Sequence, residues 1–204
     1  MPRKPQQARS RQTYDAIIQA AYIALAKNGA ELTTTRQIAD ITGIGVGSLY
    51  EYFENKQAIL DALIEHFAQA IAAHIKALTP SLVRIPLTDA VYELTLKFAE
   101  FLKANDEQYL KCARSLMLYD NHTQLSPVYR ALGELFTKHA IAHPEQLQLK
   151  NLPTVAYIFI NSGVYSMTRY LSHPNPAFSF EELAQVLANM AGHYVAMELK
   201  QGNN

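Results

Sequence analysis

The sequence predicts an all-α protein that has a helix-turn-helix near its N-terminus and a larger helical part behind it. Apolar residues recur at helical spacing along most of the chain, and no segment keeps the strict alternation of a half-buried strand. Glycines separate two short helical patterns near the N-terminus, while Pro and Asn interrupt the later ones. We therefore expect about nine helices, with an arm over 1–8, a helix-turn-helix domain over 9–67 and a C-terminal domain over 68–204.

Local start and stop signals place the first two helices. A helix over about 10–27 is expected to end at Asn28-Gly29. Thr34 with Gln37 three residues later forms a capping-box pattern, in which each side chain satisfies the other residue's backbone N–H. The first helix of the helix-turn-helix is therefore expected to begin at Thr34.

Glycine and asparagine define the turn and the helix that follows it. Gly43 supplies the permissive backbone that ends a helix and turns the chain. Gly45 can act as the next N-cap, although Ser or Asp would cap that helix better. Asn55 is expected to cap a long helix and to place Lys56 in its first turn, where exposed backbone N–H groups favour anions.

Later helices are separated by residues that stop or start helices. Thr79-Pro80 is expected to end the long helix, and the proline-rich linker 173–176 cannot be crossed by one. Ser179 with Glu182 repeats the capping-box pattern. The expected helices run over about 56–78, 86–104, 107–119, 126–143, 152–171 and 179–199.

The helix-turn-helix sequence divides into an apolar face and a polar face. Its apolar residues can face one small core: Ile38, Ile41, Ile44, Leu49 and Phe53. The side chains left to point outward are Thr34, Thr35, Arg36, Ser48, Tyr50, Tyr52 and Lys56. A DNA-reading helix needs this division, because one face enters a groove while the other packs. The alternative is a three-helix core with an ordinary solvated face.

The same stretch resembles the DNA-binding module of the TetR/AcrR family of bacterial repressors. The resemblance runs through Thr34-Thr35-Arg36, Ile38-Ala39, Gly43-Ile44, Gly47-Ser48-Leu49-Tyr50, Tyr52-Phe53 and Asn55-Lys56. It implies a homodimer that grips an inverted-repeat operator in double-stranded DNA and releases it when a small molecule fills the C-terminal domain. An effector-independent, architectural DNA-binding protein is the alternative.

The resemblance also implies roles for individual residues. By position, the phosphates would be held by Thr35, Tyr50, Tyr52 and Lys56, and the bases would be faced by Arg36 and Val46. The expected DNA-binding set is completed by Thr34, Gly45, Gly47 and Ser48. The Gly45–Gly47 triplet is less polar than is usual in that family, so Arg36 and the basic arm would carry more of the readout. A contact between Val46 and a thymine methyl is the other possibility.

Charge and composition narrow the class of protein further. The arm region carries Arg3, Lys4, Arg9 and Arg11 before the first acidic residue, which suits phosphate or minor-groove contacts but also an ordinary disordered tail. The single cysteine, Cys112, excludes an intrachain disulfide and favours a reducing cytoplasm. Apolar runs are broken by charges, so neither a membrane span nor a signal peptide is expected.

The C-terminal part combines many aromatic and Met residues with a few polar ones, as drug-sized ligand pockets do. The expected contacts of a small hydrophobic effector are Phe101, Arg114, Met117, Tyr129, Tyr157, Asn161, Tyr165 and Arg169. Each polar member could equally lie on a solvated face or in a subunit contact.

A stripe of small residues suggests close helix packing near the C-terminus. It comprises Ala184, Ala188, Ala191 and Val195, and it fits either a dimer interface, which the resemblance favours, or packing within one chain. His139 and His143 have a metal-compatible spacing, but we interpret them as two exposed histidines and expect no metal or cofactor. No phosphate loop, nucleophile elbow or buried carboxylate pair indicates an enzyme.

Overall fold

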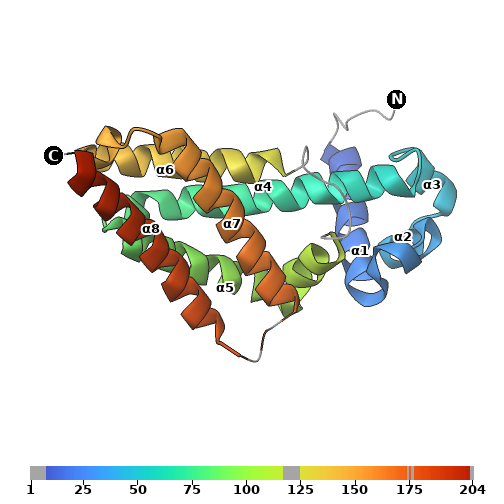
Figure 1. Cartoon of the computed structure of the whole chain (residues 1–204). Coiled ribbons are helices and arrows are strands. Elements are labelled where there is room, and N and C mark those ends of the chain that lie inside the picture. The colour runs from blue at the N-terminus through green and yellow to red at the C-terminus, as the bar shows by residue number, and fades with distance from the viewer. Residues whose placement is uncertain (1–7, 117–124, 174, 176, 203–204) are drawn as a thin grey trace. The chain divides into compact units, whose positions relative to one another are not determined.

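A computed structural model describes residues 8–116, 125–173, 175 and 177–202, and over these residues it contains helices and no strands (Figure 1). The all-α prediction is confirmed. The elements are α1 (Ala8–Leu32), α2 (Thr35–Thr42), α3 (Val46–Tyr50), α4 (Lys56–Leu82), α5 (Leu87–Leu116), α6 (Ser126–Ala142), the 3-10 helix η1 (Pro144–Gln148), α7 (Leu152–Ser172) and α8 (Phe180–Gly202).

The chain divides into two compact units. Among the described residues, the first combines 8–68 with 103–116 and 125, and the second combines 69–102 with those from 126 to 202. Residues 103–116 thus cluster with the helix-turn-helix, whereas the sequence predicted that they belong to the C-terminal domain. Helices α4 and α5 each contribute one part to either unit.

The first unit has a core built on α1. Ile17 and Leu25 are almost completely buried, and Tyr14 stacks on Phe53 with ring centroids 5.1 Å apart. Gly29 has a non-helical backbone (φ 75°, ψ 166°) inside the assigned α1, so regular helix ends where the sequence predicted. The Thr33 hydroxyl then donates a 2.7 Å hydrogen bond to the carbonyl oxygen of Gly29.

Helix α2 buries a narrower face than the sequence indicated. Ile38 and Ala39 are buried, but Ile41, which was expected in the core, is 43% exposed. At about 100° per residue, the buried face is centred between Ile38 and Ala39, and Ile41 lies about 110° from that centre. The core expected from helical spacing was therefore correct for Ile38, Leu49 and Phe53, and wrong for Ile41.

Helix α4 runs through the expected stop at Thr79-Pro80 and ends at Leu82. Pro80 has no backbone N–H to donate. Its two neighbours add side-chain hydrogen bonds to this turn: the Thr79 hydroxyl donates to the carbonyl of Ile75 at 2.9 Å, and the Ser81 hydroxyl donates to that of Leu78 at 2.8 Å. By length and composition alone α4 could cross a membrane, a test that the core helix of a soluble protein also passes. Half of its apolar window is buried.

Helix α5 replaces the two helices that were expected over 86–104 and 107–119. The backbone departs from regular helix near the expected break between the two helices, since Glu107 has a positive φ of 59°. The end of the second expected helix, beyond residue 116, lies outside the described residues.

The second unit contains α6, η1, α7 and α8. Helices α7 and α8 contact each other (Figure 1), and the capping box of α8 is present, with 2.6 Å and 3.1 Å hydrogen bonds between Ser179 and Glu182. A Cβ added to Gly192 of α8 would lie 2.0 Å from Oγ1 of Thr88, so this glycine permits close approach of α8 to α5.

The small-residue stripe of α8 lies inside this unit. Its four members, Ala184, Ala188, Ala191 and Val195, are at most 7% exposed within one chain. The interpretation of this stripe as a subunit interface is therefore wrong. Small side chains are needed here because α8 packs against its own chain.

Candidate nucleic-acid interface and ligand cavity

Helix α2 begins and ends as its sequence predicts. The Thr34 hydroxyl accepts the backbone N–H of Gln37 at 3.2 Å, and the Gln37 side chain accepts that of Thr34 at 2.9 Å. Gly43 ends the helix in the left-handed conformation (φ 77°, ψ 28°). Gly45 then occupies the N-cap of α3 without a side-chain hydrogen bond. These local interactions orient α2 and α3 around a short glycine turn.

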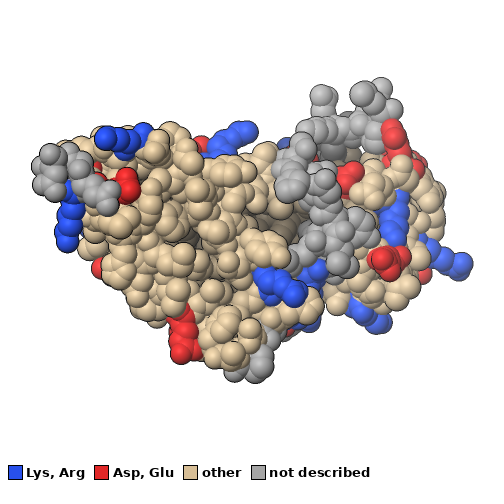
Figure 2. Space-filling model, in the orientation of Figure 1, with Lys and Arg blue, Asp and Glu red and all other residues tan. Residues whose placement is uncertain are grey.

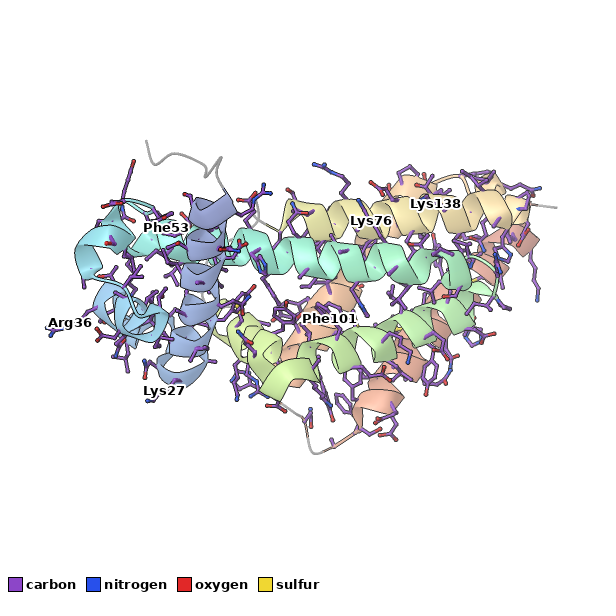
Figure 3. All side chains as sticks on the ribbon, turned by 180° about the vertical axis from the view of Figure 1, so that it is seen from behind. Lys27, Arg36, Phe53, Lys76, Phe101 and Lys138 are labelled. Atoms are coloured by element: carbon purple, nitrogen blue, oxygen red, sulfur yellow. The ribbon has the colours of Figure 1, made fainter. Side chains whose placement is uncertain are left out.

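One hydrogen bond joins the polar residues of α2 and α3. Oγ1 of Thr35 lies 3.3 Å from the hydroxyl oxygen of Tyr50, whose side chain is 49% exposed. Arg36, the next residue of α2, is exposed and points away from the helices (Figure 3). Helix α2 thus presents the guanidinium of Arg36 to solvent at the position that follows the hydrogen-bonded Thr35.

The rest of the expected DNA-binding set is also accessible. The exposed residues are Thr34, Gly45, Gly47 and Ser48, and the partly exposed ones are Val46, Tyr52 and Lys56. Lys and Arg side chains project from the helix-turn-helix unit in Figure 2. Val46 is the first residue of α3 and presents an apolar side chain between two glycines.

Lys56 makes a contact that the sequence did not reveal. Its Nζ donates a 3.0 Å hydrogen bond to the backbone carbonyl of Glu31, beyond the end of regular α1 helix. Asn55 caps α4 as expected, since its Oδ1 accepts the Ala58 N–H at 2.9 Å. Lys56 therefore ties α4 to the α1–α2 connection.

The basic arm is mostly outside the described part of the chain. Arg3 and Lys4 lie outside the described residues, as does the side chain of Arg9. Arg11 is exposed on α1.

None of the eight residues expected to bind an effector is among the residues that line the cavity of the second unit. Tyr157 and Tyr165 are 69% and 66% exposed. Nδ2 of Asn161 donates a 2.7 Å hydrogen bond to the carbonyl of Tyr157, and Nη1 of Arg169 lies 3.1 Å from Nδ1 of His173. Both side chains therefore make local contacts along α7.

The remaining four are dispersed. Phe101 stacks on His74 with centroids 4.6 Å apart, and Tyr129 is partly buried, which raises its pKa. Arg114 belongs to the first unit, and Met117 lies outside the described residues.

This cavity of the second unit has a volume of about 120 Å³. Helices α5, α6, α7 and α8 all contribute to its wall. The lining residues are Leu87, Ala90, Val91, Leu94, Thr95, Leu132, Leu135, Phe136, His139, Val155, Phe159, Ile160, Gly163, Val164, Met167, Leu187, Ala191 and Val195. Sequence reasoning missed this wall because it sought polar residues among aromatic ones, whereas the wall is mainly aliphatic.

His139 is buried in this wall, so the expectation of an exposed residue is wrong. It is 2% exposed, its Nε2 donates to the Ile85 carbonyl at 3.0 Å, and its Nδ1 lies 3.1 Å from Oε1 of Gln146. His143 stacks on it with ring centroids 4.3 Å apart. Within the described residues no group of three or more potential ligands could hold a metal ion.

Comparison with known proteins links this architecture to one family. Residues 17–63 match the family model of bacterial regulatory proteins, tetR family. The nucleoid occlusion factor SlmA of Haemophilus ducreyi is 31% identical over 77 residues, which cover 38% of this chain and 37% of that protein. The transcriptional repressor KstR2 of Mycolicibacterium smegmatis is 38% identical over 66 residues, which cover 32% and 31%.

Solved structures extend the likeness to the whole fold. The regulator FadR of Bacillus subtilis, in complex with stearoyl-CoA, has a TM-score of 0.67 at 16% identity, covering 87% of this chain and 97% of that one. The curated relatives are matched over about a third of their length, so the sequence likeness is confined to one part of them. Residues 17–63 therefore carry the DNA-binding module of the tetR family of bacterial regulatory proteins, and the rest of the chain shares the fold of a solved transcriptional regulator.

Proposed function

We propose that this chain is a DNA-binding transcriptional repressor, which a small hydrophobic effector releases from an inverted-repeat operator. The observation that carries the proposal is the exposed α2–α3 surface, where Thr35, Arg36 and Tyr50 lie next to a helix that can enter the major groove. It would act in the cytoplasm as a regulator rather than as an enzyme.

The residues of this surface divide by chemistry. Arg36 carries a planar guanidinium that can donate two hydrogen bonds to guanine. The hydroxyls of Thr35, Tyr50 and Tyr52 and the ammonium of Lys56 suit phosphate oxygens, which fix the register of the protein on the duplex. The α3 residues Gly45–Ser48 would approach the groove closely, with Val46 against a thymine methyl.

The cavity of the second unit supports ligand-dependent release. Its wall is apolar and draws on four helices, so an occupant could alter how they pack. A ligand shifts a conformational equilibrium only through its differential affinity for the two states. A coupling of about 1–3 kcal/mol would weaken operator binding by about 5- to 150-fold.

An effector-independent DNA-binding protein is the second candidate, and the similarity to SlmA, a nucleoid occlusion factor, favours it. Screening apolar compounds for a rise in melting temperature separates the two candidates, since a ligand that binds the native state stabilises it. Thermodynamic coupling is reciprocal. Operator DNA must therefore weaken the binding of a true effector by the same factor by which the effector weakens the binding of operator DNA.

DNA binding can be tested with Arg36→Ala. Duplexes selected from a random pool should contain an inverted repeat with half-sites about 34–36 Å apart. On such a duplex we expect Arg36→Ala to cost about 1–3 kcal/mol and to relax preference at one position of each half-site.

Lys138→Ala is the matched control, because it removes one exposed positive charge from α6 in the other unit (Figure 3). An equal loss of affinity in both variants would contradict base readout by Arg36. Failure to select any preferred sequence would contradict the repressor model itself.

A further inference from the structure

The cavity of the second unit has no charged residue in its wall. The lining contains no Asp, Glu, Lys or Arg, and Thr95 and His139 supply all the nitrogen and oxygen atoms of its described side chains. We propose that the occupant is a small, uncharged hydrocarbon-like molecule of about one or two rings, and that Gly163 sets its size. This inference rests on the proposed function and specifies the class of its effector.

Both polar side chains of the wall already have partners. Oγ1 of Thr95 donates a 2.7 Å hydrogen bond to the Val91 carbonyl of its own helix. His139 uses one ring nitrogen on Ile85 and has the other next to Gln146, which is itself 5% exposed. Neither side chain therefore offers a spare donor to a ligand.

A charged occupant would lose its hydration without compensation. Burying an ionised carboxylate in apolar surroundings is strongly unfavourable unless a counter-charge or several donors replace the water. Long-chain acyl thioesters with phosphate groups, such as the stearoyl-CoA bound to Bacillus subtilis FadR, could place at most their hydrocarbon part here. A neutral ring has no such cost, because transfer of its apolar surface out of water is favourable.

The size of the cavity agrees with this class. An apolar cavity of roughly 150 Å³ engineered into another protein binds benzene, and the volume here is about 120 Å³. Gly163 of α7 lines the space, and a Cβ built on it would meet no atom within 4 Å. Any side chain larger than hydrogen at position 163 would therefore occupy room that a ligand needs.

Matched pairs of probes that differ in charge test the ligand class. Toluene and benzoate form one pair, and naphthalene and 2-naphthoate form another, each applied to the purified full chain without DNA at pH 7. We expect the neutral member to raise the melting temperature in a dose-dependent way and to give nuclear Overhauser contacts with methyl groups of Leu132, Val164 and Leu187. The carboxylates should do neither.

Gly163→Leu tests the place and the size limit. We expect it to weaken binding of the neutral probe by at least about tenfold, equivalent to about 1.4 kcal/mol. Gly133→Leu on α6 is the control, because Gly133 also has no atom within 4 Å of a built Cβ but does not line the cavity. It should retain the affinity of the unmodified chain.

Three results would overturn the inference. These are tighter binding of a carboxylate than of its neutral partner, no binding by either neutral probe, and equal loss of binding in Gly163→Leu and Gly133→Leu. All three are measured without DNA, so they leave the repressor model to the operator experiments. Conversely, a chain that binds toluene but selects no DNA sequence would contradict the repressor model and leave this inference standing.

Discussion

At the scale of single residues, Lys56 makes a structural contact and is also one of the residues that we propose to bind DNA. A lysine ammonium has three N–H donors, and the 3.0 Å bond to the Glu31 carbonyl uses one of them. The other two can reach a phosphate oxygen. The contact also limits the motion of the long side chain, which lowers the entropy lost when the phosphate binds.

Lys56→Ala should weaken binding to all duplex sequences alike. Because one phosphate contact is lost, the slope of log K against log salt should flatten by about 0.9, and this can be measured by fluorescence anisotropy at several salt concentrations. Lys138→Ala should leave the slope unchanged. A loss restricted to the selected operator would instead assign Lys56 to base readout.

Tyr22 and Cys112 are buried ionisable groups in the first unit. Tyr22 is 1% exposed, its hydroxyl donates to the Leu63 carbonyl at 3.3 Å, and burial raises its pKa above the ordinary 10.0. Burial likewise raises the pKa of the Cys112 thiol above 9.0. Both groups are therefore neutral in the folded chain at a pH where the unfolded chain already ionises them.

The free energy of unfolding should be insensitive to these groups below about pH 8 and should fall as the pH rises further. Each group contributes a slope of at most about 1.4 kcal/mol per pH unit. Urea titrations between neutral and alkaline pH would measure it. Tyr22→Phe should reduce the slope above pH 10, while Tyr165→Phe, which alters a 66% exposed side chain, is the control. Equal slopes in the two variants would contradict a special role for Tyr22.

At the scale of elements, the connection between α2 and α3 depends on backbone conformation. Gly43 has a φ of 77°, which an L side chain adopts only with strain, and no atom lies within 4 Å of a built Cβ. Gly47 lies inside α3 with equally open surroundings and no positive φ. Steric crowding is thus the same at both positions, and the backbone is what differs.

Gly43→Ala should destabilise the chain by about 1–2 kcal/mol, the cost of a left-handed conformation. Gly47→Ala should stabilise it by about 0.5–1 kcal/mol, because alanine is the better helix former. Urea unfolding midpoints would compare the two. Changes of the same sign would refute the assignment of the turn to the conformation of Gly43.

At the scale of the whole molecule, the last two helices carry several exposed apolar residues. Tyr157, Ile158 and Tyr165 of α7 are more than half exposed, as are Val186 and Met190 of α8. Figure 2 shows the face of this unit that carries α7 and α8 with few Lys, Arg, Asp or Glu side chains. Such a patch favours association, so we place the proposed dimer interface here rather than on the buried alanine stripe.

Met190→Glu should shift the chain from dimer to monomer, because it places a charge in a desolvated interface without a partner. Analytical ultracentrifugation should give a dissociation constant raised by at least about tenfold, or about 1.4 kcal/mol. Ile141→Glu on α6 changes a residue of similar exposure, 63% against 56%, and should remain dimeric. A dimer that withstands Met190→Glu would exclude this face.

The sequence by itself determined the helix-turn-helix, because each of its signals acts between residues close in the chain. The Thr34–Gln37 capping box, the Gly43 turn and the Asn55 cap are set by neighbours within three or four positions. The same applies to the capping box of α8. Such interactions depend little on what packs around them.

Only the tertiary structure decided which face of each helix is buried and where the cavity lies. Helical spacing was compatible with Ile41 in the core and with the alanine stripe at a subunit interface. In the folded chain Ile41 is exposed and the alanine stripe is buried. The cavity combines Thr95, His139 and Gly163 from three different helices. Their proximity depends on helix packing, which periodicity along one helix does not specify.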